Sequence, residues 1–165
     1  PDGKIGWVQL TATGGHPGND LQHAVVRRRT GPAKGRVSLN SNFIHQPSQG
    51  DGVRYWVLSS RHGVLNTGLM HASQQPVNIK AIEVSAGDTL DFVVDIYGGL
   101  GYDQFLWSPE LELTREAPTS GPRNPEVFNA AKDFTEGPAM LGTKLTRWEQ
   151  LTQTLLMSNE LMFVD

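Results

Sequence analysis

Apolar and polar residues alternate with a period of two through much of the first 113 residues, and turn residues separate the alternating segments. The clearest example is residues 89–97, where every even-numbered position is apolar. Such alternation predicts strands with one buried face. Comparable segments are 6–11, 23–30, 36–43, 53–58, 79–84 and 105–113, and no helical pattern separates them. The sequence therefore predicts an all-β fold, an antiparallel β-sandwich (jelly roll), with a barrel as the alternative.

The pattern changes after Thr114, where a segment rich in Pro and Ser is typical of a linker. Asn124 followed by Pro125 predicts a short helix that ends near Asp133. A capping box at 146–149 then begins a second predicted helix of about 14 residues. We therefore expect a glycan-binding β-sandwich domain at 1–115, and at 116–165 a linker and helical tail that belong to the C-terminal domain of a larger parent protein.

Charge is distributed unevenly along the chain. Residues 1–61 hold eight of the fourteen Lys and Arg residues but only three of the seventeen acids. This asymmetry suggests an anionic partner for the first half, although opposite charges that pair across sheets would also explain it. The acidic second half and a pI of about 5.9 argue against nucleic acid as the partner. No apolar run is long enough to span a membrane.

The motifs of several enzyme classes are absent. The chain contains no Cys, no Gly-x-Gly-x-x-Gly or phosphate-binding loop, and no Gly-x-Ser-x-Gly string. Asp91 and Asp95 share a strand face, but four residues of strand separate their Cα atoms by about 13 Å, which is too wide for a glycosidase pair. We therefore expect a non-enzymatic protein, with a polysaccharide-cleaving enzyme as the less favoured alternative.

Metal binding has only a weak signal. The five His residues lack zinc-site spacing, so no metal ligands are assigned and no cofactor is expected. Acids in predicted loops have the oxygen chemistry that calcium prefers, which leaves a structural calcium ion as an open alternative. These acids are Asp20, Asp51, Asp88 and Asp103.

Arginines and aromatic residues occupy predicted outer faces and loops. Alternation places Arg54 and Trp56 on one face, and Asp91, Asp95 and Tyr97 on another. Planar rings suit the apolar faces of sugars, and guanidinium groups bind carboxylate or sulfate bidentately. The alternative is that Trp56 merely covers a central strand while Arg54 pairs with an Asp. In the run Arg27-Arg28-Arg29, at least one side chain must turn toward the inner layer or lie near an edge.

Two sets of segments resemble known proteins. The first resembles a carbohydrate-binding-module-like jelly-roll domain and includes Gly15-His16-Pro17-Gly18, the stretch 86–95 and Trp107-Ser108-Pro109. The second is the ending Leu145–Asp165, which resembles the C-terminus of planctomycete-type cytochrome-c-domain proteins. The resemblance implies an exported, extracytoplasmic, multidomain parent, in which this chain supplies polysaccharide binding and carries no haem.

Together these observations predict a non-catalytic carbohydrate-binding module for an anionic or sulfated polysaccharide. A structural module that docks onto other domains of the parent is the alternative. The candidate ligand-binding residues are His16, His23, Arg28, His45, Arg54, Trp56, Arg61, Tyr97 and Tyr102.

Overall fold

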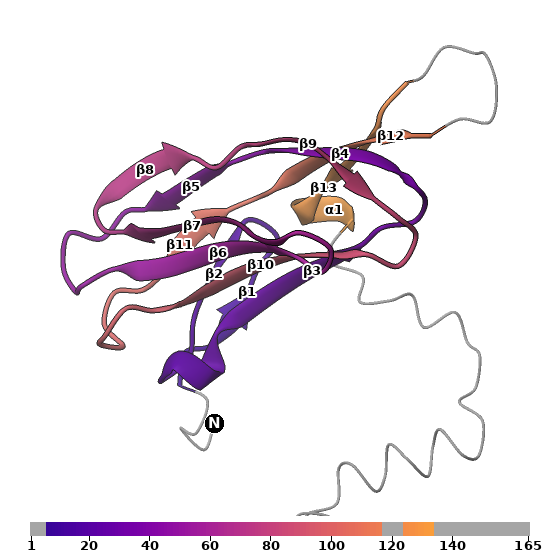
Figure 1. The fold of residues 1–165 in the computed structure, drawn as a ribbon. Coiled ribbons are helices and arrows are strands. Elements are labelled where there is room, and N and C mark those ends of the chain that lie inside the picture. The colour runs from indigo at the N-terminus through magenta and orange to yellow at the C-terminus, as the bar shows by residue number, and fades with distance from the viewer. Residues whose placement is uncertain (1–5, 117–123, 134–165) are drawn as a thin grey trace, which may run out of the picture. The chain divides into compact units, whose positions relative to one another are not determined.

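The computed structural model describes residues 6–116 and 124–133, and these residues form antiparallel β-sheets and a short helix (Figure 1). The predicted all-β sandwich is confirmed. The structure describes thirteen strand segments, arranged in three sheets.

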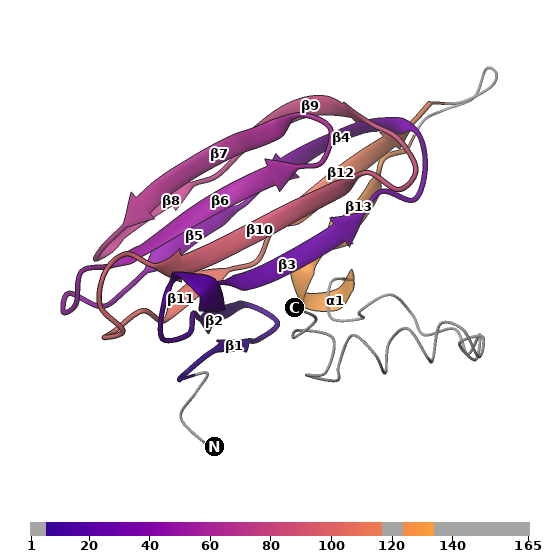
Figure 2. The ribbon, with the colours of Figure 1, turned by 60° about the horizontal axis from the view of Figure 1, so that its bottom comes forward.

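One layer of the sandwich is a four-stranded sheet with the order β3-β10-β6-β7 (Figure 2). Its strands are β3 (Val25–Thr30), β10 (Thr89–Ile96), β6 (Val53–Ser59) and β7 (Gly63–Met70). In β6 the residues alternate between buried and partly exposed, as the sequence pattern predicts. The partly exposed positions of β6 and β10 form the outer face of this layer.

The other layer is built from two sheets whose strands continue into each other. The first has the order β1-β2-β11-β5-β8 and the second β13-β12-β4-β9. Ser41 alone separates β5 from β4, and Ser108 and Pro109 alone separate β11 from β12. The two sheets are therefore the halves of one bent layer. Their strands are β1 (Gln9–Leu10), β2 (Gly14–His16), β11 (Phe105–Trp107), β5 (Asn42–His45), β8 (Ser73–Pro76), β13 (Glu126–Asn129), β12 (Glu110–Arg115), β4 (Gly35–Asn40) and β9 (Ile79–Val84).

A cluster of aromatic rings fills the centre of the core. The Phe43 ring stacks on those of Tyr55 and Phe105, with centroids 5.0 and 5.5 Å apart. Trp107 meets Phe92 edge to face at 5.4 Å. These rings come from both layers, and each is at most 4% exposed. Burial of such large apolar surfaces provides most of the stabilisation between the layers.

The helix predicted from Asn124 to Asp133 is wrong for most of its length. Residues 126–129 form strand β13, which pairs with β12, and only α1 (Ala130–Asp133) is helical. The edge of β12 offers hydrogen bonds, and Phe128 packs against the core, so tertiary context overrides the local signal. The sandwich therefore continues past residue 115, where we expected it to end. The helix predicted after residue 146 lies outside the described residues.

Candidate functional site

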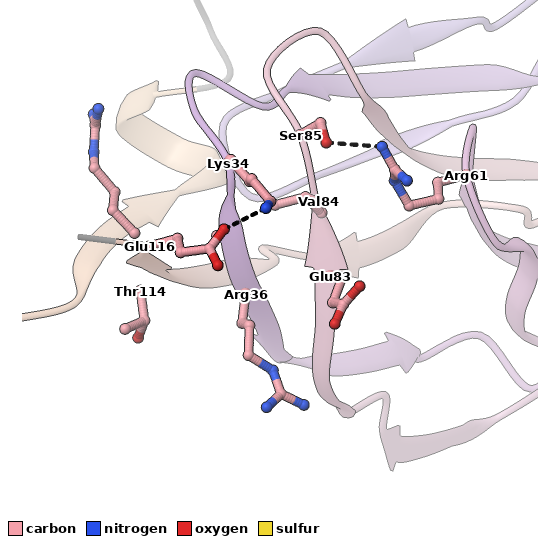
Figure 3. Close-up of a pocket in the computed structure, with 10 residues that line it drawn as sticks. Lys34, Arg36, Arg61, Glu83, Val84, Ser85, Thr114 and Glu116 are labelled. Carbon is pink, nitrogen blue, oxygen red and sulfur yellow. Dashed lines mark hydrogen bonds and ion pairs between the residues drawn. The ribbon is translucent and has the colours of Figure 1, made fainter. Parts of the chain in front are cut away.

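A depression of about 260 Å³ lies at one end of the sandwich (Figure 3). Four basic residues line it together with two acidic and two hydroxyl residues. The set that defines this cationic depression is Lys34, Gly35, Arg36, Arg61, Glu83, Val84, Ser85, Thr114, Arg115 and Glu116.

The floor of the cationic depression is a cross-strand row. Arg36 of β4 lies opposite Glu83 of β9 on one side and Thr114 of β12 on the other. Val37, the next residue after Arg36, is buried in the core, so strand alternation turns Arg36 outward. The row therefore presents a guanidinium, a carboxylate and a hydroxyl group on one surface.

The β6–β7 and β9–β10 turns, at the same end of the sandwich, form the rim of the depression. Arg61 donates from Nε to Asp88 at 2.7 Å. It also donates from Nη2 to the Ser85 hydroxyl at 2.8 Å (Figure 3). The bond from Arg61, followed by that from the backbone N–H of Ser85, lowers the pKa of Asp88. These contacts hold the β6–β7 and β9–β10 turns together and fix the direction of Arg61.

Two further basic residues, Lys34 and Arg115, line the depression. Lys34 pairs with Glu116 at 2.6 Å, and this bond raises the pKa of Lys34. Arg115 donates from Nε and Nη2 to the two carboxylate oxygens of Glu126.

The four positive charges of the cationic depression are matched by four carboxylates, two in the lining and two beside it. Asp88 and Glu126 balance Arg61 and Arg115 from just outside the cavity lining, whereas the hydrogen bond of Arg36 goes to the carbonyl of Ala81, at 3.5 Å. A guanidinium has five N–H donors. Within the described part of the chain, the Nη1 atoms of Arg36, Arg61 and Arg115 therefore have no hydrogen-bond partner.

Of the predicted binding residues, Arg61 lies in the cationic depression, while three others lie on the outer face of the β3-β10-β6-β7 sheet. There Arg28 forms a bidentate pair with Asp91, with both bonds at 2.7 Å. Arg54 does the same with Asp95, at 3.1 and 2.8 Å. The two aspartates considered above as a catalytic pair are thus each bound by an arginine.

Trp56 lies between these ion pairs on the same outer face. The guanidinium carbon of Arg54 is 5.2 Å from the ring centroid of Trp56, within the range of a cation–π contact. The part of the indole that faces Arg54 is therefore covered by protein. This arrangement matches the alternative in which Trp56 covers a central strand and Arg54 pairs with an Asp.

Tyr97 and Tyr102 flank the glycine-rich loop after β10, at the end of the sandwich opposite Arg61, and are 51% and 54% exposed. His45 and His16 are buried, at 0% and 8% exposure. His16 hydrogen bonds the carbonyl of Pro17 at 2.7 Å. The predicted residues therefore do not form one surface.

The last predicted residue, His23, ends the short 3-10 helix η1 (Leu21–His23). Its Nδ1 lies 2.7 Å from a carboxylate oxygen of Asp20, which also accepts from the backbone N–H of Gln22. These bonds, led by that from His23, lower the pKa of Asp20. His23 therefore forms part of a local helix cap.

As predicted, the side chains of Arg27, Arg28 and Arg29 in β3 do not all face outward. Arg27 is 8% exposed and donates to the carbonyls of Thr11 at 2.6 Å and Trp107 at 3.3 Å. Arg29 stacks over Phe128 with 4.1 Å between its guanidinium carbon and the ring centroid. Only Arg28, between them, is on the outer face.

Lys34, Arg36 and Arg115 were missed as candidate site residues. The basic excess of residues 1–61 was the available signal for the first two, since both lie in that segment. Arg115 lies beyond it and is brought to Arg36 only by the pairing of β12 with β4. A contact of that kind between distant segments has no local signature.

Comparison with family models, with curated proteins and with solved structures gives no match. No helix within residues 6–116 and 124–133 is long and apolar enough to cross a membrane.

Proposed function

We propose that this chain is a non-catalytic carbohydrate-binding module that binds an anionic polysaccharide through the cationic depression. The supporting observation is the composition of this cavity, in which four basic side chains accompany two carboxylates and two hydroxyl groups. Its volume of about 260 Å³ suits a single sugar unit of a longer chain better than a large ligand.

Each part of the depression has a counterpart in an acidic sugar. The Nη1 groups of Arg36 and Arg61 are donors for a sulfate or carboxylate. Glu83 and Thr114 are suited to accept hydrogen bonds from ring hydroxyls. The side chain of Arg36 bonds a backbone carbonyl and not a carboxylate, so a ligand with negative charge gains more at Arg36 than a neutral sugar does. The location outside the cytoplasm and the larger parent belong to the same proposal and rest on the resemblance alone.

Affinity electrophoresis of the full chain through gels that contain neutral or sulfated polysaccharides tests this proposal. We expect retardation by sulfated polysaccharides, with a loss of retardation as salt is raised, because screening weakens charge contacts at an exposed site. Arg36→Gln should weaken binding by about tenfold to a hundredfold, since a charge-assisted hydrogen bond contributes about 1.5–3 kcal/mol.

Arg28→Gln is the matched control. It removes the same charge from the same residue type in the sheet on the other side of the sandwich, so binding should change by less than about twofold. Trp56→Ala separates the two surfaces further: if it abolishes binding while Arg36→Gln does not, the ligand binds the outer face instead. Absence of retardation by every polysaccharide would contradict the proposal.

A second candidate is an interaction module that docks onto other domains of its parent. The outer face of the β3-β10-β6-β7 sheet favours it, because Val26, Val64 and Leu69 are 47%, 61% and 49% exposed there. They lie on β3 and β7, the two edge strands of this sheet, so they flank the face on which a partner domain would dock. Concentration-dependent association of the chain that Val64→Lys prevents, without polysaccharide binding, would support this candidate.

A further inference from the structure

Asp103 is a buried carboxylate in the loop between β10 and β11. Its exposure is 0%, and neither of its carboxylate oxygens has a hydrogen-bond partner among the described residues. Buried carboxylates are normally paired or hydrogen-bonded, because water no longer compensates their charge. A buried carboxylate whose two oxygens lack such partners is suited to bind a cation.

Protonation alone does not remove this deficit. Burial, and to a smaller degree the charge of Asp51, raise the pKa of Asp103 to about 6. Even a protonated carboxyl group would bury a hydroxyl donor without an acceptor, so the missing partners do not depend on its protonation state. A cation bound to the oxygens would satisfy both the charge and the lone pairs.

Asp51 lies in the facing loop between β5 and β6. Its Oδ2 accepts a hydrogen bond from the backbone N–H of Gly99 at 2.9 Å, in the same loop that carries Asp103. A Cβ atom at Gly98 would come within 2.6 Å of this oxygen, and one at Gly50 within 2.2 Å of the carbonyl oxygen of Gly101. Glycines thus let the loop that carries Asp51 and the loop that carries Asp103 approach closely.

The other two acids considered for calcium are already engaged. Asp20 caps η1 and bonds His23, and Asp88 pairs with Arg61. No group of three or more His, Cys, Asp or Glu that could hold a metal is found in the described part of the chain. A metal held mainly by side-chain nitrogen or sulfur is therefore not indicated, and oxygen ligands from two loops remain.

We propose that Asp51 and Asp103 bind a calcium ion that ties the β5–β6 loop to the β10–β11 loop. Calcium accepts six to eight oxygen ligands in irregular geometry, including backbone carbonyls, whereas magnesium demands a near-ideal octahedron. The site lies at the start of β6, and Arg61 of the cationic depression follows the other end of that strand. Calcium binding here is therefore independent of the proposed polysaccharide site.

Calorimetric titration of the full chain with calcium chloride, after treatment with a chelator, tests this proposal. We expect one bound calcium ion and weaker binding of magnesium. Calcium at ten times the dissociation constant should raise the melting temperature by about 5 °C. Asp103→Asn and Asp51→Asn should each abolish both effects, whereas Glu112→Gln, which removes an exposed carboxylate of β12, should leave them unchanged.

The chelated variants show whether a lost effect is merely lost folding. Without calcium, Asp103→Asn should melt at the same or a higher temperature than the unaltered chain, because it removes an unpaired buried charge. The proposal is overturned if the unaltered chain shows neither heat of binding nor a shift in melting temperature. It is also overturned if Asp103→Asn binds calcium as the unaltered chain does.

Discussion

His45 donates its Nε2 hydrogen to the backbone carbonyl of Tyr102, 2.9 Å away. Because a carbonyl can only accept, this bond fixes the proton on Nε2. Nδ1 is then an acceptor, and the backbone N–H of Ala72 donates to it at 3.2 Å. Both nitrogens of the neutral ring are thus satisfied, and protonation of Nδ1 would set two donors against each other.

Folding should therefore become less stable as the pH falls below about 6.5, through His45. Burial first, and the charge of His71 in addition, lower the pKa of His45 from its ordinary value of 6.5. The unfolded chain then binds the proton more readily, so this stabilisation is complete above pH 6.5 and is lost below it, by at most about 1.4 kcal/mol per pH unit. Chemical denaturation between pH 7.5 and 5 measures it.

His45→Gln is the comparison that isolates this residue, because glutamine does not titrate. Asp103 has a raised pKa and acts in the opposite direction over pH 4 to 6, but it is present in both chains and cancels. The difference in unfolding free energy between the two chains should shrink as the pH falls. A difference independent of pH would contradict this account of His45.

Arg27 should contribute far more to stability than its neighbour Arg28. Its buried guanidinium satisfies the carbonyls of Thr11 and Trp107, and both bonds disappear in Arg27→Met. We expect that substitution to lower the unfolding free energy by about 2–3 kcal/mol, because charge-assisted bonds to buried groups are lost. Arg28→Met, at the exposed neighbouring position, should cost under about 1 kcal/mol by urea denaturation. Equal costs would show that burial does not distinguish the two.

The hydroxyl group of Tyr55 should contribute measurably to the stability of the fold. The hydroxyl donates to Oδ1 of Asn66 at 2.9 Å and accepts from Nε2 of Gln75 at 2.6 Å, which links β6 to β7 and to β8. Tyr55→Phe keeps the ring stack with Phe43 but leaves both amides without this partner. We expect a loss of about 1–3 kcal/mol in denaturation experiments. A neutral result would mean that water replaces the hydroxyl at both amides.

Alternation predicted those strands in which one face packs on the core. In β10 the apolar positions Leu90 to Ile96 are buried as expected, and the layer follows from that pattern. The strands β7 and β8 were not predicted, because residues 63–70 and 73–76 lack strict alternation and include polar side chains on both faces. These two segments are strands because they pair with β6 and β5, and the local sequence does not show that pairing.

The candidate site was harder to predict than the fold. Spacing showed that Arg54 and Asp95 each face outward from a strand, but not that β6 and β10 are neighbours in register. That register turns a potential ligand-binding arginine into one half of a bidentate pair. The cationic depression likewise depends on β4, β9 and β12 lying side by side, which no local pattern encodes.

The two ion pairs of the outer face should differ in strength. In the Arg54–Asp95 pair the side chains are 32% and 7% exposed, against 61% and 15% in the Arg28–Asp91 pair. Solvent screens the more exposed pair more strongly, and Trp56 additionally holds Arg54 in place. Double-mutant cycles with Arg→Met and Asp→Asn should give a coupling of about 1–2 kcal/mol for Arg54–Asp95 and below about 1 kcal/mol for Arg28–Asp91. Raising the salt to about 1 M should reduce the second coupling more than the first. The reverse order would show that exposure does not determine the coupling energy of these pairs. It would also show that the Trp56 contact does not strengthen the Arg54–Asp95 pair.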